Sequence, residues 1–264
     1  MQLGLPISIG IVGTGRVAQA FARRWAGLPE VVSVKWILGR RPEAVSSLQA
    51  LLPAAPESLD KLPQSRVDVD CVVLAASDDA LPSLMEHFES SFVLHFSGSA
   101  PAPKIGAVLW PIRAISSSET IDWSTLPCGL EFSGRSNPEN IEEWLRTTAP
   151  NSQTMNSKER IGAHLTAVVV ANFTNHLLAL GQELAGRSGL EWSTFVPLID
   201  GVWEAARRGE SREAQTGPAA RGDELTVGRH RVWLEENAPQ LLTLYNTLTA
   251  QISTFHNSAP HDPS

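Results

Sequence analysis

A glycine-rich loop near the N-terminus has the spacing of a phosphate-binding turn. Gly13, Gly15 and Ala18 form the pattern G-x-G-x-x-A directly after the apolar run 7–12. The first glycine allows a tight turn, the second lets the backbone approach a pyrophosphate, and the small alanine lets a helix pack closely on a strand. This context favours a dinucleotide site over a purely structural glycine turn. The candidate cofactor contacts in this loop are Gly13, Thr14, Gly15, Arg16 and Val17.

The residues after the next apolar run, 31–38, indicate which dinucleotide is preferred. An NAD site places an Asp or Glu there, about 20 residues after the glycine loop, to bind the ribose 2′-hydroxyl. This chain has Arg40 and Arg41 instead. A guanidinium pairs with a 2′-phosphate that a carboxylate would repel, so we expect NADP as the cofactor. Two alternatives stay open, because the arginines can be plain surface charges and because Glu43 lies close enough to allow NAD.

Residues after two later apolar runs, 69–76 and 92–96, are expected to line the same site. In doubly wound sheets the ligand lies beyond the carboxyl ends of the strands. Asp78 has two interpretations, as the N-cap of the helix that follows or as a site residue, and the N-cap is favoured. The candidates for lining the cofactor are Ser77, Ser97 and Gly98.

An apolar helix predicted over residues 164–184 carries a stripe of imidazole and amide side chains. At about 100° per residue the stripe is roughly 120° wide. It lines a polar cavity or a subunit contact, or else it satisfies backbone groups in the core. His164 is the candidate proton donor because imidazole titrates near working pH, and Asn172 is the candidate for orienting a substrate. The members of the stripe are His164, Asn172, Asn175, His176 and Gln182.

The segment 216–223, Thr-Gly-Pro-Ala-Ala-Arg-Gly-Asp, predicts a rigid turn. Asp223 is expected to cap the helix that begins at residue 224 or 225, which explains the turn without any function. Arg221, held at this turn, could grip a substrate carboxylate or a cofactor phosphate. His230 is a weaker candidate for the same site.

The elements that must position these residues alternate, in the first half of the chain, between β-rich runs and helical patterns. This alternation predicts βαβ units and a parallel sheet. A helix with Asn137 as its cap and Pro138 in its first turn is predicted to start at residue 139. The remaining expected strands are 108–115 and 129–132, both as edge strands, and the remaining expected helices are 18–25, 42–52 and 80–88.

After a polar linker over 150–156 the pattern is helical only, with further helices over 192–208 and 226–253, the latter broken near Pro239. The predicted fold class is α/β, with an N-terminal Rossmann-like doubly wound parallel sheet followed by an all-α C-terminal domain. The expected domains are 1–153 for the dinucleotide and 154–255 for substrate and dimerisation. Residues 256–264 are expected to form a disordered tail, since few of them are apolar.

Composition excludes several classes of protein. The net charge of −7 argues against binding nucleic acid or an anionic membrane through a general positive field. Two distant cysteines show neither disulfide nor metal spacing, so we expect no metal and a cytoplasmic protein. Polar residues in the middle of the apolar run 165–180 favour a buried helix of a soluble protein over a membrane span. Only four of the 21 basic residues are lysines.

These motifs together resemble a family of bacterial proteins that have a Rossmann-like domain followed by a helical C-terminal domain of uncharacterised function. The family is related in build to ketopantoate reductase, pyrroline-5-carboxylate reductase and the 6-phosphogluconate dehydrogenase superfamily. The resemblance covers nearly the whole chain and implies a C-terminal domain of the 6-phosphogluconate dehydrogenase type and a homodimer through it. It is carried by the glycine loop, by H-x-S-G at residues 95–98, by His164 with Asn172, and by residues 216–223 with His230.

Two departures from this resemblance bear on the chemistry. Where the family has His-Pro soon after H-x-S-G, this chain has Trp110-Pro111. Related hydroxyacid dehydrogenases carry Lys-x-x-x-Asn on the first long helix, and if Asn172 is that Asn, Val168 occupies the lysine position. A lysine acid/base mechanism should therefore not be carried over to this chain.

Two functions from different classes follow. The first is an NADP-dependent oxidoreductase that transfers hydride between the nicotinamide and a small carbonyl, hydroxy or imine compound in an interdomain cleft. In it His164 relays a proton, Asn172 orients the substrate and Arg221 holds an anionic group. The second is a non-catalytic NADP-binding sensor or assembly protein in which the polar stripe is a dimer contact. The resemblance also implies a minor third, the use of a deazaflavin cofactor together with NADP.

Overall fold

The computed structural model describes residues 5–63, 68–116, 120–134 and 139–257, and these form two compact units. The first unit is Met1–Asn172 and the second is Phe173–Ser264. The sheet ends well before this boundary, so the first unit also contains the beginning of the helical half. The two units are described separately below.

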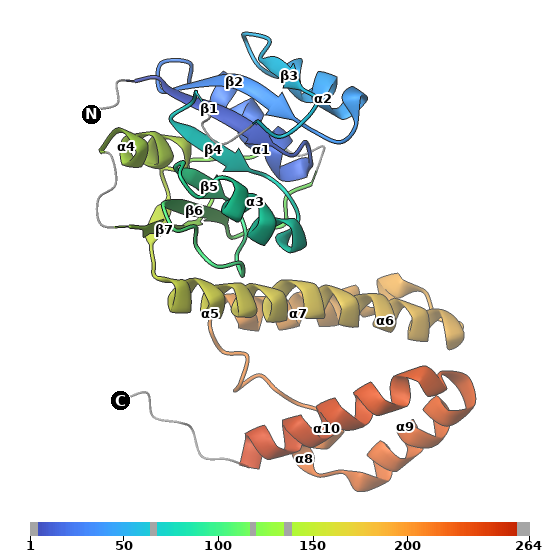
Figure 1. Ribbon diagram of the computed structural model, residues 1–264. Helices are drawn as coiled ribbons and strands as arrows, with labels where there is room; N and C mark the ends of the chain where they lie inside the picture. Colours follow the sequence, from blue (N-terminus) through green and yellow to red (C-terminus); the bar gives the residue numbers. More distant parts are fainter. Residues whose placement is uncertain (1–4, 64–67, 117–119, 135–138, 258–264) are drawn as a thin grey trace. The chain divides into compact units, whose positions relative to one another are not determined.

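The first unit is built on one sheet with the strand order β3-β2-β1-β4-β5-β6-β7-β8 (Figure 1). All neighbouring strands pair in parallel except β6 with β7. From β1 the chain winds outward to β3 and then returns to β4 on the other side, which is the doubly wound arrangement predicted from the sequence. The strands are β1 (Ile7–Val12), β2 (Val32–Leu38), β3 (Glu57–Leu59), β4 (Cys71–Leu74), β5 (Val93–His95), β6 (Gly106–Pro111), β7 (Cys128–Ser133) and β8 (Ser152–Thr154).

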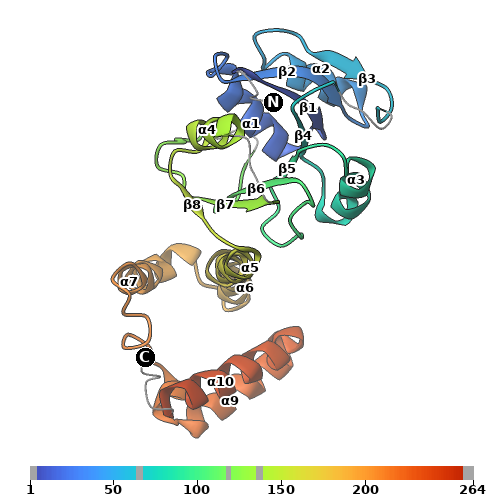
Figure 2. The ribbon, with the colours of Figure 1, turned by 60° about the vertical axis from the view of Figure 1, so that its left-hand side comes forward.

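Helices cover both faces of this sheet, so the central strands are buried on both sides (Figure 2). On one face Ile9 and Ile11 pack with Phe21 of α1 and Trp144 of α4. On the other face Val72 packs with Leu81 of α3 and its neighbours. Because alternate side chains of a strand point to opposite faces, strands buried in this way read as continuous apolar runs. The helices are α1 (Arg16–Ala26), α2 (Pro42–Gln49), α3 (Leu81–His87), preceded by the 3₁₀ turn η1 (Asp78–Ala80), and α4 (Glu139–Thr148).

Three details of the sheet differ from the sequence-based expectations. The structure adds β3, and it adds β8 inside the segment 150–156 that was predicted to be a linker. Both strands have three residues of mostly polar composition, too short to show a period, and they form because a neighbouring strand offers a free edge. β6 and β7 were both expected at an edge, but β6 lies between β5 and β7, and β7 lies between β6 and β8. Asn137 and Pro138, the expected start of α4, lie outside the described residues.

The long helical run of the C-terminal half begins inside the first unit. Asn156 caps α5 (Ser157–Ala167) and forms a capping box with Glu159. The run continues as the π-helical segment η2 (Val168–Phe173) and as α6 (Thr174–Arg187). The expectation of one uninterrupted α-helix is therefore wrong. A π-helix turns less per residue, so His164 and the polar residues beyond η2 do not share the single stripe computed for a regular helix.

This run is also far more exposed than the sequence suggests. Only Arg160 and Ala185 are buried along its described residues, while Leu165, Val170 and Phe173 are each more than half exposed. The prediction of a buried helix is thus wrong for the single chain. By length and composition alone, Ser157–Arg187 is long and apolar enough to cross a membrane. The amide and imidazole side chains in its middle argue against such a span.

The second unit consists of helices only. Leu234, Ala238 and Leu241 are buried together, with Leu180 and Leu184 of α6 packed against them. The predicted break near Pro239 is confirmed by the 3₁₀ turn η4 (Pro239–Leu241). The other elements are η3 (Trp192–Phe195), α7 (Val196–Arg207), α8 (Pro218–Arg221), α9 (Glu224–Asn237) and α10 (Leu242–Asn257). Residues 258–264 of the predicted tail lie outside the described residues.

Candidate functional site

A cavity of about 620 Å³ lies in the first unit, at the carboxyl ends of β1, β4, β5 and β6. β1 and β4 are the neighbours between which the winding of the chain reverses, and this is where ligands of doubly wound sheets bind. The volume is within the range of sites for small molecules and cofactors. The cavity is lined by Gly15, Arg16, Val17, Leu74, Ala75, Ala76, Ser77, Asp78, Phe96, Ser97, Gly98, Trp110, Pro111, Arg113, Ala114, Ile115 and His164.

The glycine loop between β1 and α1 has a backbone that only glycine tolerates well. Gly13 has a φ of +108°, and a Cβ added to it would lie 2.2 Å from the carbonyl oxygen of Ala75. Gly15 is the N-cap of α1 and provides no capping side chain, and a Cβ at Gly15 would have open space around it. No acidic residue stands in the first turn of α1. The free N–H groups at this helix start can therefore face an anion.

The two arginines at the end of β2 are not part of the cavity lining. Arg40 and Arg41 are exposed and follow Gly39, which approaches Thr14 of the glycine loop so closely that a Cβ would lie 2.6 Å from its methyl carbon. Arg41 also lies near Glu43, with 3.9 Å between Nε and Oε1. The structure thus places both arginines beside the glycine loop on the solvent side. Pairing between exposed groups such as Arg41 and Glu43 is weak and leaves the guanidinium available to a phosphate.

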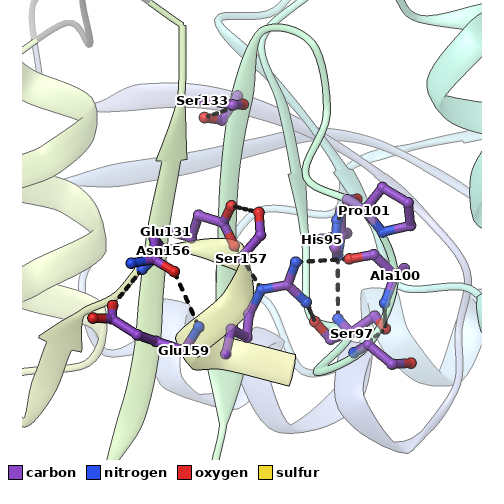
Figure 3. Close-up of polar contacts among 12 residues, drawn as sticks. His95, Ser97, Ala100, Pro101, Glu131, Ser133, Asn156, Ser157 and Glu159 are labelled. Carbon is purple, nitrogen blue, oxygen red and sulfur yellow. Dashed lines mark hydrogen bonds and ion pairs between the residues drawn. The ribbon is translucent and has the colours of Figure 1, made fainter. Parts of the chain in front are cut away.

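The H-x-S-G segment after β5 is held by its own hydrogen bonds (Figure 3). His95 is fully buried, its Nε2 lies 3.0 Å from the carbonyl oxygen of Pro101, and its Nδ1 accepts the N–H of Ser97 at 3.2 Å. A ring that accepts at Nδ1 and faces a carbonyl at Nε2 is neutral and carries its proton on Nε2. Burial lowers the pKa of His95 to about 4. His95 therefore shapes this loop and has no free nitrogen for acid/base chemistry.

The Ser97 side chain also bonds within the loop. Its hydroxyl oxygen accepts the N–H of Ser99 at 3.2 Å and that of Ala100 at 2.9 Å. The loop is consequently rigid where it faces the cavity, and its Gly98 has no room for a side chain. A Cβ at Gly98 would lie 2.3 Å from Cδ2 of His164 and 2.8 Å from Cε2 of Trp110.

His164 reaches the cavity from α5. Its ring rests on Gly98 and meets Trp110 edge to face, with 5.5 Å between the ring centroids. His164 is half-buried and its ring has no hydrogen bond to any described residue, so the ring nitrogens are available to a ligand. The structure thus brings His164 together with six of the residues that the sequence predicts as cofactor contacts: Gly15, Arg16, Val17, Ser77, Ser97 and Gly98.

Asp78 differs from its favoured interpretation as an N-cap. The N-cap of η1 is Ser77, and Asp78 makes no cap bond. Its carboxylate instead accepts a hydrogen bond from the Ser99 hydroxyl at 2.9 Å and lines the cavity. The 3₁₀ turn that precedes α3 shifts the helix start and frees this side chain. Sequence reasoning missed Arg113, Ala114 and Ile115, because the strand predicted over 108–115 ends at Pro111 as β6 and these residues lie beyond it.

The other two predicted catalytic residues lie elsewhere in the chain. Asn172 is exposed within η2, at the end of the first unit. Arg221 is exposed and ends α8 in the second unit, followed by Gly222 in the left-handed conformation. Asp223 caps α9 by accepting the N–H of Thr226 at 3.0 Å, as predicted. In the same unit Nδ1 of His230 lies 2.8 Å from the hydroxyl of Tyr245, which occupies one ring nitrogen.

Neither metal nor thiolate chemistry finds support in the described residues. Within them no cluster of His, Cys, Asp or Glu could hold a metal ion. Burial raises the pKa of Cys71, and it raises the pKa of Cys128 to about 12. Both cysteines are therefore protonated thiols at neutral pH.

Comparison with known proteins covers the C-terminal half and the overall fold. Residues 126–252 match a family described as a domain of unknown function (DUF2520). No curated protein matches the chain. A protein described as a candidate NADP oxidoreductase from Bacteroides fragilis is similar in structure, with 25% identity and a TM-score of 0.76 over 94% of this chain and 98% of that one.

Two further structures are similar at lower identity. The reductive aminase from Aspergillus terreus, in complex with NADPH and ethyl levulinate, has 13% identity and a TM-score of 0.65 over 97% of this chain and 96% of that one. A pyrroline-5-carboxylate reductase from Coxiella burnetii has 15% identity and a TM-score of 0.52, covering 96% and 100%. These similarities along the whole chain confirm the predicted fold, a Rossmann-like sheet followed by a helical C-terminal part.

Proposed function

We propose that this protein is an NADP-dependent oxidoreductase acting on a small carbonyl, hydroxy or imine compound. One observation carries the proposal: a single cavity at the switch point of the sheet joins the start of α1 to the free imidazole of His164. The α1 N-terminus supplies unpaired N–H donors without an acidic neighbour, which fits a pyrophosphate. NADP, when bound, supplies or accepts a hydride at the nicotinamide.

The two ends of the cofactor are assigned to different groups of this chain. Thr14, Gly15, Arg16 and Val17 bind the pyrophosphate through the loop and the helix start. Arg40 and Arg41, beside Thr14 and Gly39, bind the 2′-phosphate through their guanidinium groups. Ser77, Ser97 and Gly98 line the nicotinamide end. The absence of a carboxylate directly after β2 favours NADP over NAD.

The chemical roles fall to residues of the helical run and the second unit. His164 donates or accepts the proton that accompanies hydride transfer, since it lines the cavity with both ring nitrogens free. Asn172 orients the substrate and Arg221 holds an anionic group of it. The comparisons support the reaction class, because the Bacteroides fragilis protein is described as a candidate NADP oxidoreductase and the Aspergillus terreus enzyme as a reductive aminase.

Cofactor binding is tested by titrating the protein with NADPH and with NADH and following fluorescence transfer from tryptophan to the nicotinamide. We expect tight binding of NADPH and weak binding of NADH. The double variant Arg40→Ala with Arg41→Ala should weaken NADPH far more than NADH, with Arg146→Ala as a surface control. Equal loss for both cofactors would contradict the phosphate contact, and binding of neither cofactor would contradict the proposed function.

Turnover is tested with a panel of small keto acids, aldehydes and cyclic imines. His164→Ala should lower kcat and leave NADPH affinity nearly intact, because the imidazole serves the chemical step. Loss of NADPH binding with little change in kcat would instead make His164 a cofactor contact.

One observation favours a second candidate function, a non-catalytic NADP-binding sensor or assembly protein. If Asn172 matches the Asn of the hydroxyacid dehydrogenases that the chain resembles, Val168 stands in the position of their lysine and their acid/base group is missing. Tight NADPH binding without turnover of any member of the panel would favour this sensor over the enzyme.

We also propose a homodimer formed through the helical half. Large apolar side chains are exposed in each of the two units, and exposed clusters of this kind mark interaction sites. A second copy of the same chain would cover these apolar side chains without the need for a different partner protein. Ultracentrifugation should show a dimer for the wild type and a monomer for Leu165→Glu with Leu198→Glu. The exposed residues are Ile161, Leu165, Val169, Val170, Phe173 and Leu177 on the long run, and Val196, Leu198, Val202 and Trp203 on α7.

A further inference from the structure

A buried arginine lies one helical turn before His164 and has no role in the function proposed above. Arg160 of α5 is completely buried. Its Nε donates to Oε2 of Glu131 at 2.7 Å, its Nη1 to the carbonyl oxygen of Ser97 at 3.0 Å, and its Nη2 to that of Ala100 at 2.7 Å. The guanidinium therefore lies between β7 and the loop after β5, and Figure 3 labels its partners Glu131, Ser97 and Ala100. One side chain thus ties together three separate elements of the first unit.

The partner carboxylate is buried as well. Glu131 of β7 is 6% exposed, and its second oxygen accepts a hydrogen bond from the Ser157 hydroxyl at the start of α5. Burying a charge costs several kcal/mol unless it is paired and its remaining donors are satisfied. Only the planar fork of arginine presents several donors in fixed, diverging directions, so a lysine could not make these three bonds together.

The two carbonyls that Arg160 holds lie on either side of the residue on which His164 rests. Ser97 precedes Gly98 and Ala100 follows it by two positions, and the His164 ring packs against Gly98. Ser157, Arg160 and His164 are spaced by three and four residues, so they share one face of α5. Since the His164 ring has no hydrogen bond to a described residue, the position of the ring depends on how α5 and this loop are fixed to each other.

We infer that Arg160, paired with Glu131, is a positioning residue that holds His164 over Gly98 at the cavity. The guanidinium fixes both the helix that carries the imidazole and the loop on which the imidazole rests. It anchors α5 to β7 through Glu131, and it holds the loop through the two carbonyls. Stability alone would be served by an apolar pair of similar volume. Unlike an apolar pair, the guanidinium of Arg160 bonds to the loop at the cavity, and it thereby sets the distance between His164 and the cavity lining.

The position of the His164 ring is tested first, in an experiment that needs no turnover. The observable is the NMR signal of the proton on Cδ2 of His164, which is assigned by its absence in His164→Asn. The edge-to-face contact with Trp110 should shift this signal by ring current, and Trp110→Leu should remove the shift. The main variant combines Arg160→Met with Glu131→Gln, which removes both charges and leaves none buried alone. We expect this variant to fold and to lose the ring-current shift.

A matched control removes an exposed ion pair from the same unit. Arg146 and Glu142 pair at 2.8 Å on the surface of α4, so Arg146→Met with Glu142→Gln should keep the shift. Arg160→Lys keeps a paired charge without the fork and gives the same test if the main variant does not fold. A folded Arg160 variant that retains the full ring-current shift would overturn the inference.

The kinetic part of the test rests on the proposed oxidoreductase function. With the best substrate of the panel, the main variant and Arg160→Lys should lower kcat by about 100-fold, the effect of misplacing a catalytic group by about 1 Å. NADPH affinity should fall far less than kcat, because neither Arg160 nor Glu131 lines the cavity and the groups assigned to the pyrophosphate and the 2′-phosphate stay in place. Unchanged kcat in a folded variant would overturn the positioning role. Absence of any turnover in the wild type would overturn the proposed function and leave the NMR result standing.

Discussion

Two turns, residues 97–100 and 216–223, are both rich in Gly, Ser, Thr and Ala, yet they are held in different ways. The first is fixed from a distance, since Arg160 donates to its carbonyls across 60 and 63 residues of sequence. The second is held mainly by neighbours, with Asp223 bonding to Thr226 and its own N–H donating to Pro218. Its Arg221 is exposed, whereas Arg160 is completely buried.

This difference teaches where the site is sensitive to change. A turn held by a buried charge depends on every partner of that charge, because a partner lost in the interior leaves the other unpaired. A turn held by local bonds near water loses only those bonds. We therefore expect substitutions around residues 97–100 to cost much more than similar substitutions around residues 216–223.

The largest expected effect is on stability, from breaking the buried pair on one side. Arg160→Met leaves Glu131 as an unpaired buried carboxylate and should lower the free energy of unfolding by about 3–5 kcal/mol. Arg221→Met at the exposed turn should change it by less than about 0.5 kcal/mol. Urea denaturation of both variants measures the two values. Similar losses would show that the two turns are not held differently.

The second effect is the dependence of stability on pH through His95. Burial lowers its pKa to about 4 from an ordinary 6.5, so between these values the unfolded chain binds more protons than the folded one. Titration of His95 therefore leaves the free energy of unfolding unchanged above about pH 6.5. As the pH falls from 6.5 towards 4, it lowers the free energy of unfolding by on the order of 3 kcal/mol.

Denaturation from pH 7 to pH 4 tests this linkage. His95→Gln should flatten the decline, because it removes the buried imidazole and keeps a donor for Pro101. His230→Gln, at an exposed histidine of the second unit, is the comparison. Equal slopes for the two variants would argue against the linkage to His95.

A third, smaller effect concerns space at the first turn. Gly98→Ala places a Cβ 2.3 Å from His164 Cδ2, and such overpacking should cost about 1–3 kcal/mol. Gly228→Ala in α9 meets nothing within 4 Å and should stabilise the protein by up to about 1 kcal/mol through helix propensity. Thermal unfolding distinguishes the two signs. A neutral Gly98→Ala would mean that the His164 ring yields easily.

The smallest effect is expected at the locally held turn. The hydrogen bonds from Thr226 lower the pKa of Asp223. Because the pKa of Asp223 is lower in the folded protein than in the unfolded chain, the ionised carboxylate stabilises the fold above the unfolded-chain pKa. This stabilisation is lost as the pH falls through the pKa of the folded protein. Asp223→Ala removes the cap and should lower the unfolding temperature slightly, while Asp223→Asn should keep the cap and lose its pH dependence. A large drop for Asp223→Ala would show that this turn carries more of the fold than its contacts suggest.

Much of the fold was predictable because local patterns and tertiary packing agree there. β1 has the predicted bounds. Gly13, Gly15 and Ala18 lie at the junction of β1 and α1, where a tight turn and close helix packing require small residues. His164, which lines the cavity, was selected as a candidate from its residue type and its place on a predicted helix. The three-residue edge strands β3 and β8 were not predicted, because their polar residues gain order only from a neighbouring strand.

Arg160 and Glu131 were also missed, for a physical reason. In this sequence Arg160 lies before the helix predicted over 164–184, and Glu131 lies in a strand expected at an edge, so both residues indicate surface positions. Nothing local shows that the two meet in the interior. The spacing of Arg160 from His164 was the only available signal, and it indicates a shared face without saying what covers it.

The sequence by itself determined the fold class, the glycine loop and the identity of the proton-transfer candidate, since periodicity and residue type act over a few residues. The tertiary structure decided which groups lie together. In the structure both ring nitrogens of His95 are hydrogen-bonded, those of His164 are not, and the long helix is interrupted at η2. Arg160, which looks like a surface charge in the sequence, is buried and bonds to Glu131 and to the loop at the cavity. These outcomes depend on burial and on bonds between residues far apart in the chain, which no local pattern encodes.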